Sequence, residues 1–163
     1  KTSLLSEART YKIGKKLVPL SEKINIWVKE AKLIYQVPSL QVKLGSLLPV
    51  MAEPSSLYQV FSNIIGNAIK YSSQQEYPTL EIHSEQVNDG VIYYFKDNGI
   101  GIPREEIDEI YSNMQRASNS GNFQGNGIGL FIVKRIMETL QGTIEVQSIV
   151  NKGTEVKLFF PDN

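Results

Sequence analysis

The most regular hydrophobic patterns in this chain have helical spacing. After Pro19, apolar residues recur every three or four positions: Leu20, Ile24, Trp27, Val28 and Ala31. This spacing predicts a helix with one buried face. The same reasoning predicts a helix from about Ser55 to Tyr71, a short helical piece from Arg104 to Ile110, and a helix from about Gly127 to Gln141. The last should stop at Gly142, because glycine is favoured just past helix ends.

Other segments alternate between apolar and polar residues, which predicts strands with one buried face. The apolar positions of these segments are Leu40, Val42 and Leu44; Leu80 and Ile82; Val91, Tyr93 and Phe95; Ile144 and Val146; and Val156, Leu158 and Phe160. Asn88-Asp89-Gly90 and Asn151-Lys152-Gly153 are hairpin signals between neighbouring strands. Residues 48–54 are expected to form a turn region. These elements predict an α+β fold, a two-layer α/β sandwich in which helices cover one face of a mixed sheet.

Composition narrows the classes of function. The 163 residues suffice for one domain with a real core. Seventeen basic and seventeen acidic side chains cancel, so we expect no nucleic acid partner. No apolar run approaches the roughly 20 residues of a membrane span, so we expect no direct membrane contact by this domain. Cysteine is absent, which excludes disulfides and thiolate chemistry. The chain starts at Lys1, so we expect it to be a piece of a longer protein.

Three polar residues form a stripe on the predicted helix from Ser55 to Tyr71. Asn63, Asn67 and Lys70 are four and three residues apart, so they lie side by side next to the apolar face. Amide oxygens can bind Mg²⁺ and an ammonium can meet a phosphate. The alternative is that these are ordinary solvated helix residues, and the stripe alone favours that alternative.

Two glycine-rich segments follow. Asp97-Asn98-Gly99-Ile100-Gly101-Ile102-Pro103 comes directly after an apolar strand, and its glycines would let a ligand approach the backbone. An Asp at this strand end could accept a hydrogen bond from a base amine. Gly125-Asn126-Gly127-Ile128-Gly129-Leu130 opens the third helix, where free N–H groups favour phosphate. Neither segment is decisive alone. The first could be an ordinary turn, and the second fits neither a Walker loop nor a dinucleotide fingerprint.

In their order and spacing, NIIGNAIKYS, DNGIGIP and GNGIGL resemble the N box and two glycine boxes of sensor histidine kinases. Those kinases belong to the wider GHKL ATP-binding superfamily, which shares the Bergerat fold. Residues 110–116 resemble a diverged F box, with Met114 where the family usually has an aromatic residue. The resemblance runs from about Val18 to Pro161. It implies a domain that binds ATP and Mg²⁺, with a mobile lid between the glycine boxes.

The resemblance also implies a role for each matching residue. Asn67 would bind Mg²⁺ with help from Asn63, Lys70 would contact phosphate, and Arg116 would reach the γ-phosphate. Tyr71 would lie near the base and Asp97 would bind the adenine amine. The remaining positions would shape the pocket or hold the phosphates: Gly99, Gly101, Ile102, Gly125, Asn126, Gly127, Ile128, Gly129 and Leu130.

In such kinases the phosphate acceptor is a histidine on a helical hairpin. The single histidine here, His83, is predicted on the outer face of a strand and is expected to be a bystander. We therefore expect residues 1–16 to be the tail of a truncated dimerisation helix and residues 17–163 to be the catalytic domain. The resemblance implies a histidine-containing dimerisation domain of the same parent protein and a response regulator as partners, a homodimeric parent and a cytoplasmic location. Whether the parent is membrane-anchored stays open.

Two alternatives remain at this point. An ATP-hydrolysing member of the superfamily commonly carries Glu at the position of Asn63, as a base for water, and an amide cannot accept a proton at neutral pH. An anti-sigma-like serine kinase usually stands alone, without the helical remnant expected at residues 1–16. Both observations favour the histidine kinase.

Overall fold

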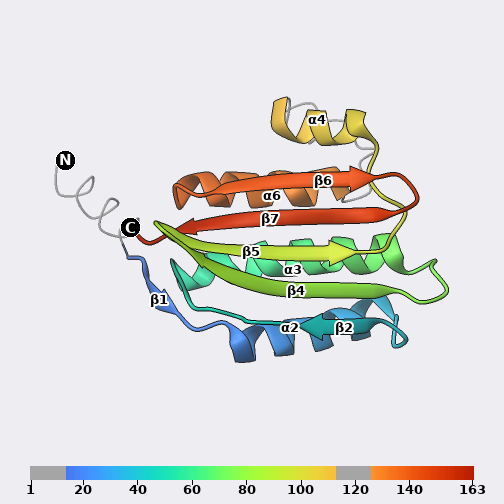
Figure 1. The fold of residues 1–163 in the computed structure, drawn as a ribbon, viewed down its shortest axis with the longest axis horizontal. Coiled ribbons are helices and arrows are strands. Elements are labelled where there is room, and N and C mark those ends of the chain that lie inside the picture. The colour runs from blue at the N-terminus through green and yellow to red at the C-terminus, as the bar shows by residue number, and fades with distance from the viewer. Residues whose placement is uncertain (1–13, 113–125) are drawn as a thin grey trace.

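Strands and helices follow one another in a mixed order along the chain (Figure 1). This computed structural model describes residues 14–112 and 126–163. The elements are β1 (Lys16–Val18), α2 (Ser21–Tyr35), β2 (Gln41–Leu44), β3 (Val50–Ala52), α3 (Pro54–Ser72), β4 (Thr79–Val87), β5 (Gly90–Asp97), α4 (Arg104–Ser112), α6 (Asn126–Thr139), β6 (Thr143–Ile149) and β7 (Gly153–Pro161).

The main sheet has five strands in the order β2-β4-β5-β7-β6. β2 runs parallel to β4, and the other neighbouring pairs are antiparallel. Helices α2, α3 and α6 lie behind one face of this sheet (Figure 1). The two-layer α+β architecture with a mixed sheet is therefore confirmed, as are the two hairpins that join β4 to β5 and β6 to β7.

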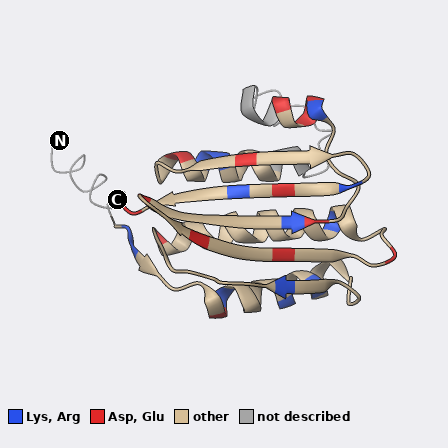
Figure 2. Ribbon diagram, in the orientation of Figure 1, with Lys and Arg blue, Asp and Glu red and all other residues tan. Residues whose placement is uncertain are grey.

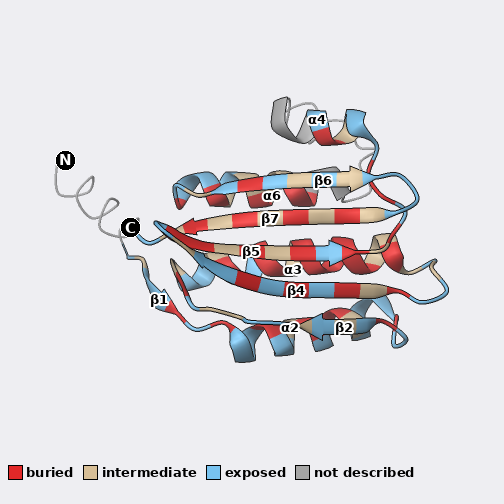
Figure 3. Ribbon diagram, in the orientation of Figure 1, coloured by how far each residue is buried: buried red, intermediate tan, exposed pale blue. Residues whose placement is uncertain are grey.

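The core lies between the sheet and these helices. Inward residues of β4, β5 and β7 are buried in alternation with exposed or half-buried ones (Figure 3). Helix α3 runs through the middle of this layer, and Pro54 at its start supplies the fixed φ that suits a first turn. Its Phe61 side chain is fully buried and contacts the rings of Trp27, Tyr93 and Phe95 at centroid distances of 5.4–5.5 Å.

Two local predictions were wrong. Residues 48–54 are not only a turn, because they contain β3, which pairs antiparallel with β1 in a separate two-stranded sheet. Lys16, expected at the end of a helix, is the first residue of β1. Gly14 and Lys15 are not helical either, and residues 1–13 lie outside the described part of the chain. Three-residue strands are too short for alternation to reveal them.

The end of α6 also differs from the prediction. The helix ends at Thr139, and the left-handed residue beyond it is Gln141, with φ of 64°, instead of Gly142. The N–H of Gly142 still closes the helix by donating to Met137 O at 2.8 Å. Gly142 is required for a different reason: a Cβ there would lie 2.1 Å from Phe159 O. Close approach to β7, and not a left-handed backbone, explains this glycine.

The two ends of the described domain meet at one corner. Lys15 Nζ donates to Asn163 O at 2.6 Å and to Leu140 O at 3.2 Å. The adjacent turn between β4 and β5 is tied to the same corner, since Asp162 N donates to Asp89 O at 2.9 Å. Within the described residues, none of the helices combines the length and hydropathy that a membrane crossing requires.

Candidate functional site

The asparagine stripe predicted on α3 meets the start of α6. The Asn63 amide nitrogen donates to Gln59 O at 2.7 Å, which fixes the side chain with its oxygen as the remaining acceptor. A Cβ at Gly129 would lie 3.1 Å from Asn63 Oδ1 and 3.5 Å from Asn67 Nδ2. Asn67 is buried, although it sits on a helix surface. The first and third predicted motifs, more than 60 residues apart, are therefore in contact.

Lys70, the third member of the stripe, turns toward α2. Its ammonium lies 5.9 Å from the centre of the Tyr35 ring, within cation–π distance. Tyr35 also lies over Gly66, where a Cβ would come within 2.9 Å of the tyrosine hydroxyl. Lys70 thus contacts an aromatic ring between two helices, and its contact with a phosphate stays a prediction.

The loop after β5 is folded against two other segments. A Cβ at Gly99 would lie 2.7 Å from the carbonyl of Tyr71, at the end of α3. Gly101 has φ of 82°, in the left-handed region that glycine favours, and a Cβ there would lie 2.6 Å from Ile149 O. Both glycines predicted to shape the pocket are therefore needed for close packing of this loop.

Asp97 ends β5 and points into the core side of the sheet. Its side chain is buried, and its Oδ1 accepts a hydrogen bond from Gly99 N at 2.8 Å. Burial raises the pKa of this carboxyl to about 6, and hydrogen bonds from the backbone of Gly99 and Thr154 oppose the rise. The carboxylate is thus ionised at neutral pH, with its ordinary solvation replaced by two backbone donors.

Tyr71 contributes a half-buried polar group beside Asp97. Burial raises the pKa of its phenol, and the charges of Glu106 and Asp97 raise it further. The phenol is neutral at neutral pH, so it can still donate a hydrogen bond. Glu106 belongs to α4, which packs against α6.

These side chains line one pocket between α3, α6 and the sheet. The empty space within it is about 280 Å³, open mouth included. Five of its residues were predicted as site residues: Asn67, Tyr71, Asp97, Ile102 and Leu130. The others are apolar except for Thr154: Ile64, Ala68, Phe95, Thr154 and Val156. The structure therefore brings together one residue or more from each of the three predicted motifs.

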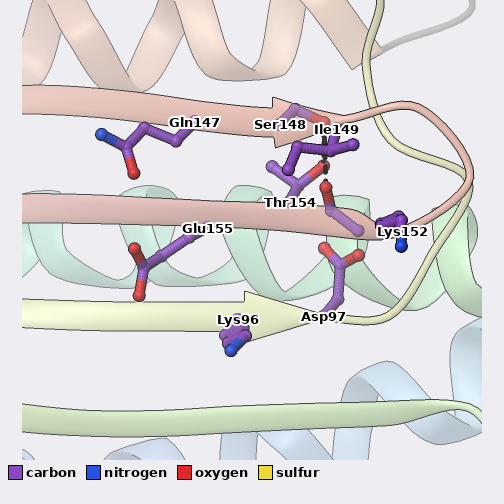
Figure 4. A pocket seen from close by; sticks show the side chains of 9 residues that line it. Lys96, Asp97, Gln147, Ser148, Ile149, Lys152, Thr154 and Glu155 are labelled. Atoms are coloured by element: carbon purple, nitrogen blue, oxygen red, sulfur yellow. Dashed lines mark hydrogen bonds between the residues drawn. The ribbon is translucent and has the colours of Figure 1, made fainter.

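A larger hollow of about 760 Å³, open mouth included, lies at the same end of the sheet (Figure 4). It is lined by residues of β5, β6 and β7 and the turn between the last two, including Lys96, Gln147, Lys152 and Glu155. Among the side chains that the structure describes, no asparagine of α3 and no residue of α6 borders it. We therefore assign the predicted site to the smaller pocket, where the predicted residues converge.

The remaining predicted residues divide into two groups. Asn126, Gly127 and Ile128 form the beginning of α6, as the helix-opening motif requires. Arg116 and Gly125 lie outside the described residues, as does most of the expected lid and F box.

A sequence model of the histidine kinase-, DNA gyrase B- and HSP90-like ATPases matches residues 52–163, more than half of the chain. The chain belongs to this ATPase family. The match covers all three predicted motifs.

Named relatives include a phytochrome-like protein and a sensor protein kinase. The chain is 33% identical to the phytochrome-like protein Cph1 of Synechocystis over 74% of its own length and 16% of that protein. It is 32% identical to the sensor protein kinase WalK of Staphylococcus haemolyticus over 67% of its length and 18% of that protein. It therefore spans less than a fifth of these curated relatives.

A solved structure of a mycobacterial sensor histidine kinase, MprB, has the same fold, with a TM-score of 0.73 and 21% identity over 90% of this chain and 97% of that one.

Sequence reasoning missed three polar residues at or near this pocket. Thr154 is buried and lines it, Ser148 is hydrogen-bonded to Thr154, and Asn98 binds the loop before β4 through Thr79 N and Tyr77 O at 2.9 and 2.8 Å. Thr154 could have been found from alternation, because it shares the inward face of β7 with Val156 and Leu158.

Proposed function

We propose that this domain binds Mg–ATP in the pocket around Asp97 and donates the γ-phosphate to a histidine of a separate dimerisation hairpin, as part of a two-component sensor kinase. One observation carries the proposal. A buried carboxylate at one end of the pocket and a pair of α3 asparagines beside Gly129 of α6 are joined by a wall of apolar side chains. That arrangement suits a base at one end and phosphates at the other.

Asp97 is the proposed base-recognition residue. Its carboxylate can accept a hydrogen bond from the exocyclic amine of adenine, whereas guanine presents a carbonyl at the same place. Two acceptors would then face each other without a proton between them, which is costly in a buried site. The apolar walls formed by Ile64, Ile102 and Val156 would pack on the faces of the base.

The phosphates would lie where α3 meets α6. The amide oxygens of Asn63 and Asn67 are hard donors of the kind that Mg²⁺ accepts, and the first N–H groups of α6 favour anions. Among the described residues no three His, Asp or Glu side chains group into a metal site. Two amides cannot fill an octahedral shell, so these residues fit a cation that arrives with the phosphates. When bound, Mg²⁺ would neutralise phosphate charge.

The acceptor has to come from outside the described pocket. His83 lies exposed on β4, on the sheet face opposite the helices, and its ring stacks on Tyr94 at 4.6 Å. It neither lines the pocket nor has a carboxylate partner among its described contacts. The proposed partners are accordingly a histidine-containing hairpin of the same parent protein and a response regulator. The parent is proposed to be a homodimer, with this domain in the cytoplasm.

Transfer is favoured over hydrolysis by the chemistry of Asn63. Phosphoryl transfer depends mostly on positioning and charge neutralisation, so the donor domain needs no nucleophile of its own. A hydrolase needs a base for water, and the Asn63 amide nitrogen is already donating to Gln59 O.

The metal assignment is tested by calorimetry of ATP binding with and without Mg²⁺. In Asn67→Ala, the enhancement by Mg²⁺ should disappear. Asn25→Ala is the control, because Asn25 is a helical asparagine on α2 that does not line the pocket and donates to Ser21 O at 2.9 Å. An enhancement that survives in Asn67→Ala would refute the assignment.

The phosphotransfer assignment is tested with γ-labelled ATP. Alone, the chain should neither label itself nor release phosphate at an appreciable rate. With the histidine hairpin of its parent protein added, acid-labile label should appear on the hairpin. Label on the isolated chain would give His83 an acceptor role, and rapid phosphate release would favour an ATPase.

A further inference from the structure

We propose that Ser148 is a positioning residue for nucleotide binding. Its hydroxyl bonds the loop after β5 to strand β7. These two segments form the polar end of the pocket, and the bond fixes their relative position. The inference rests on the proposed function, since the nucleotide is that of the Asp97 pocket. Ser148 itself does not line that pocket.

The Ser148 hydroxyl has three partners on two segments. It accepts a hydrogen bond from Ile102 N at 2.6 Å, it donates to Gly153 O at 3.1 Å, and it lies 2.8 Å from the hydroxyl of Thr154. Figure 4 shows the Ser148 and Thr154 side chains facing each other above the carboxylate of Asp97. One hydroxyl therefore joins β6, β7 and the loop after β5.

Both segments that it joins reach the pocket. Ile102 and Thr154 are pocket-lining residues, and both are almost fully buried. Asp97 is held between the same two segments, because its carboxylate accepts from the backbone of Gly99 on one side and of Thr154 on the other. A shift of the loop relative to β7 would therefore change the position of the Asp97 carboxylate as well as the apolar wall.

The other hydrogen bonds of the loop do not fix the segment around Ile102 relative to β7, so Ser148 does so. Asn151 N donates to Ile100 O at 2.7 Å, which holds the tip of the loop on the turn after β6. Gly101 follows with its left-handed conformation, and the freedom of the glycine backbone would allow the residues after it to change direction. Ile102 comes directly after Gly101, and its N–H is fixed by Ser148. Without the hydroxyl, a buried N–H would lose its acceptor, and relieving that loss requires the loop to move.

A matched control lies toward the opposite edge of the same sheet. Ser84, on β4, also accepts from a backbone N–H, that of Leu48 at 2.8 Å, and donates to Ser46 O at 2.8 Å. It is likewise a strand serine that ties a loop to the sheet, but none of its partners lines the pocket. Ser84→Ala and Ser148→Ala should therefore cost similar stability.

The test compares Mg–ATP binding by the two variants at a temperature where both are folded. Ser148→Ala should raise the dissociation constant about tenfold, whereas Ser84→Ala should change it less than twofold. Ser148→Thr, which keeps the hydroxyl on a strand residue, should restore binding to within about threefold of wild type. Equal constants for Ser148→Ala and Ser84→Ala would overturn the proposal, as would a failure of Thr to rescue.

Amide hydrogen exchange without nucleotide supplies an independent readout. The Ile102 amide should exchange faster in Ser148→Ala and normally in Ser84→Ala, where the Leu48 amide should respond instead. Unchanged protection of Ile102 would also overturn the proposal. If the wild-type domain fails to bind Mg–ATP at all, the proposed function is wrong, whereas the exchange result still decides whether Ser148 fixes the loop.

Discussion

The two ends of α3 lie against the same sheet but in opposite kinds of surroundings. In its N-terminal half, Phe61 is packed among the rings of Trp27, Tyr93, Phe95 and Phe160. Toward its C-terminus, the helix borders a pocket that holds three of the five buried polar residues described: Asn67, Asp97 and Thr154. The packed end supplies stability, whereas the polar end places hydrogen-bonding groups beside a pocket that a ligand could enter.

Charged residues lie mainly elsewhere, on the face of the sheet that no helix covers. Figure 2 shows acidic and basic residues on the same strands, and the register sets Lys96 between Glu81 and Glu155. Opposite charges across neighbouring strands are mildly stabilising and create no field of one sign. This face therefore differs from both ends of α3.

The largest effect is expected at the packed end. Phe61→Ala should lower the free energy of unfolding by about 3–5 kcal/mol, because it leaves a cavity among four rings. Chemical denaturation measures this loss. Tyr58→Ala is the control, since Tyr58 touches only the edge of the cluster and is half exposed. The folded fraction of Phe61→Ala should bind ATP normally, and a large loss of affinity there would break the division between the two ends.

Asp97→Asn should weaken ATP binding strongly and change the free energy of unfolding less than Phe61→Ala does. Loss of a charged hydrogen-bond acceptor costs about 1.5–3 kcal/mol, so ATP affinity should fall by roughly 10- to 100-fold. The preference for ATP over GTP should fall with it. Competition binding with both nucleotides measures these changes. A variant that still discriminates against GTP as well as wild type would show that Asp97 does not read the base.

The same carboxyl predicts a pH dependence of stability. Its pKa is raised by burial from 3.8 to about 6 in the folded state, so folding favours the protonated form. The resulting stabilisation is fully present below about pH 4 and is lost as the pH rises through about 6. Denaturation between pH 4 and 8 should show this decline in wild type, and Asp97→Asn should lack it. Parallel curves for the two proteins would contradict the prediction.

Gly129→Ala should separate stability from binding. Alanine is favoured over glycine in a helix by roughly 1 kcal/mol, so the unfolding free energy should rise slightly. The new Cβ would crowd Asn63 Oδ1 at 3.1 Å, so the Mg²⁺ enhancement of ATP binding should fall several-fold. Thermal melts and calorimetry on the same sample measure both effects. Unchanged binding would mean that the asparagine pair adapts to the extra methyl group.

His83→Ala should have the smallest effect. It removes a stacked ring from the uncovered face, where an aromatic cross-strand pair contributes about 0.2–1 kcal/mol. Phosphorylation of an added histidine hairpin should proceed at the wild-type rate. A loss of labelling would show that the uncovered face takes part in the reaction.

The sequence predicted the periodic elements and much of the pocket, for identifiable reasons. Asn63, Asn67, Asp97 and Leu130 belong to motifs whose spacing carries information over a few residues. The β1–β3 pair depends on a contact between segments about 30 residues apart, with three residues on each side. Ser148 depends on a register between β6 and β7 and on a left-handed residue in a distant loop. Such features arise from tertiary packing, which local patterns do not encode.

The corner that joins Lys15 to Asn163 gives the domain the geometry of a lever. It lies beside the Gly90 end of β5, and the pocket lies at the Asp97 end of the same strand. Seven residue steps along a strand span roughly 24 Å, so a rotation of about 10° at the corner would sweep the pocket through about 4 Å. That displacement is comparable to the difference between a phosphate held in contact with an acceptor and one held out of reach. Because this corner and the pocket lie at opposite ends of β5, a small rotation about the corner would move the pocket farther than it moves the rest of the strand.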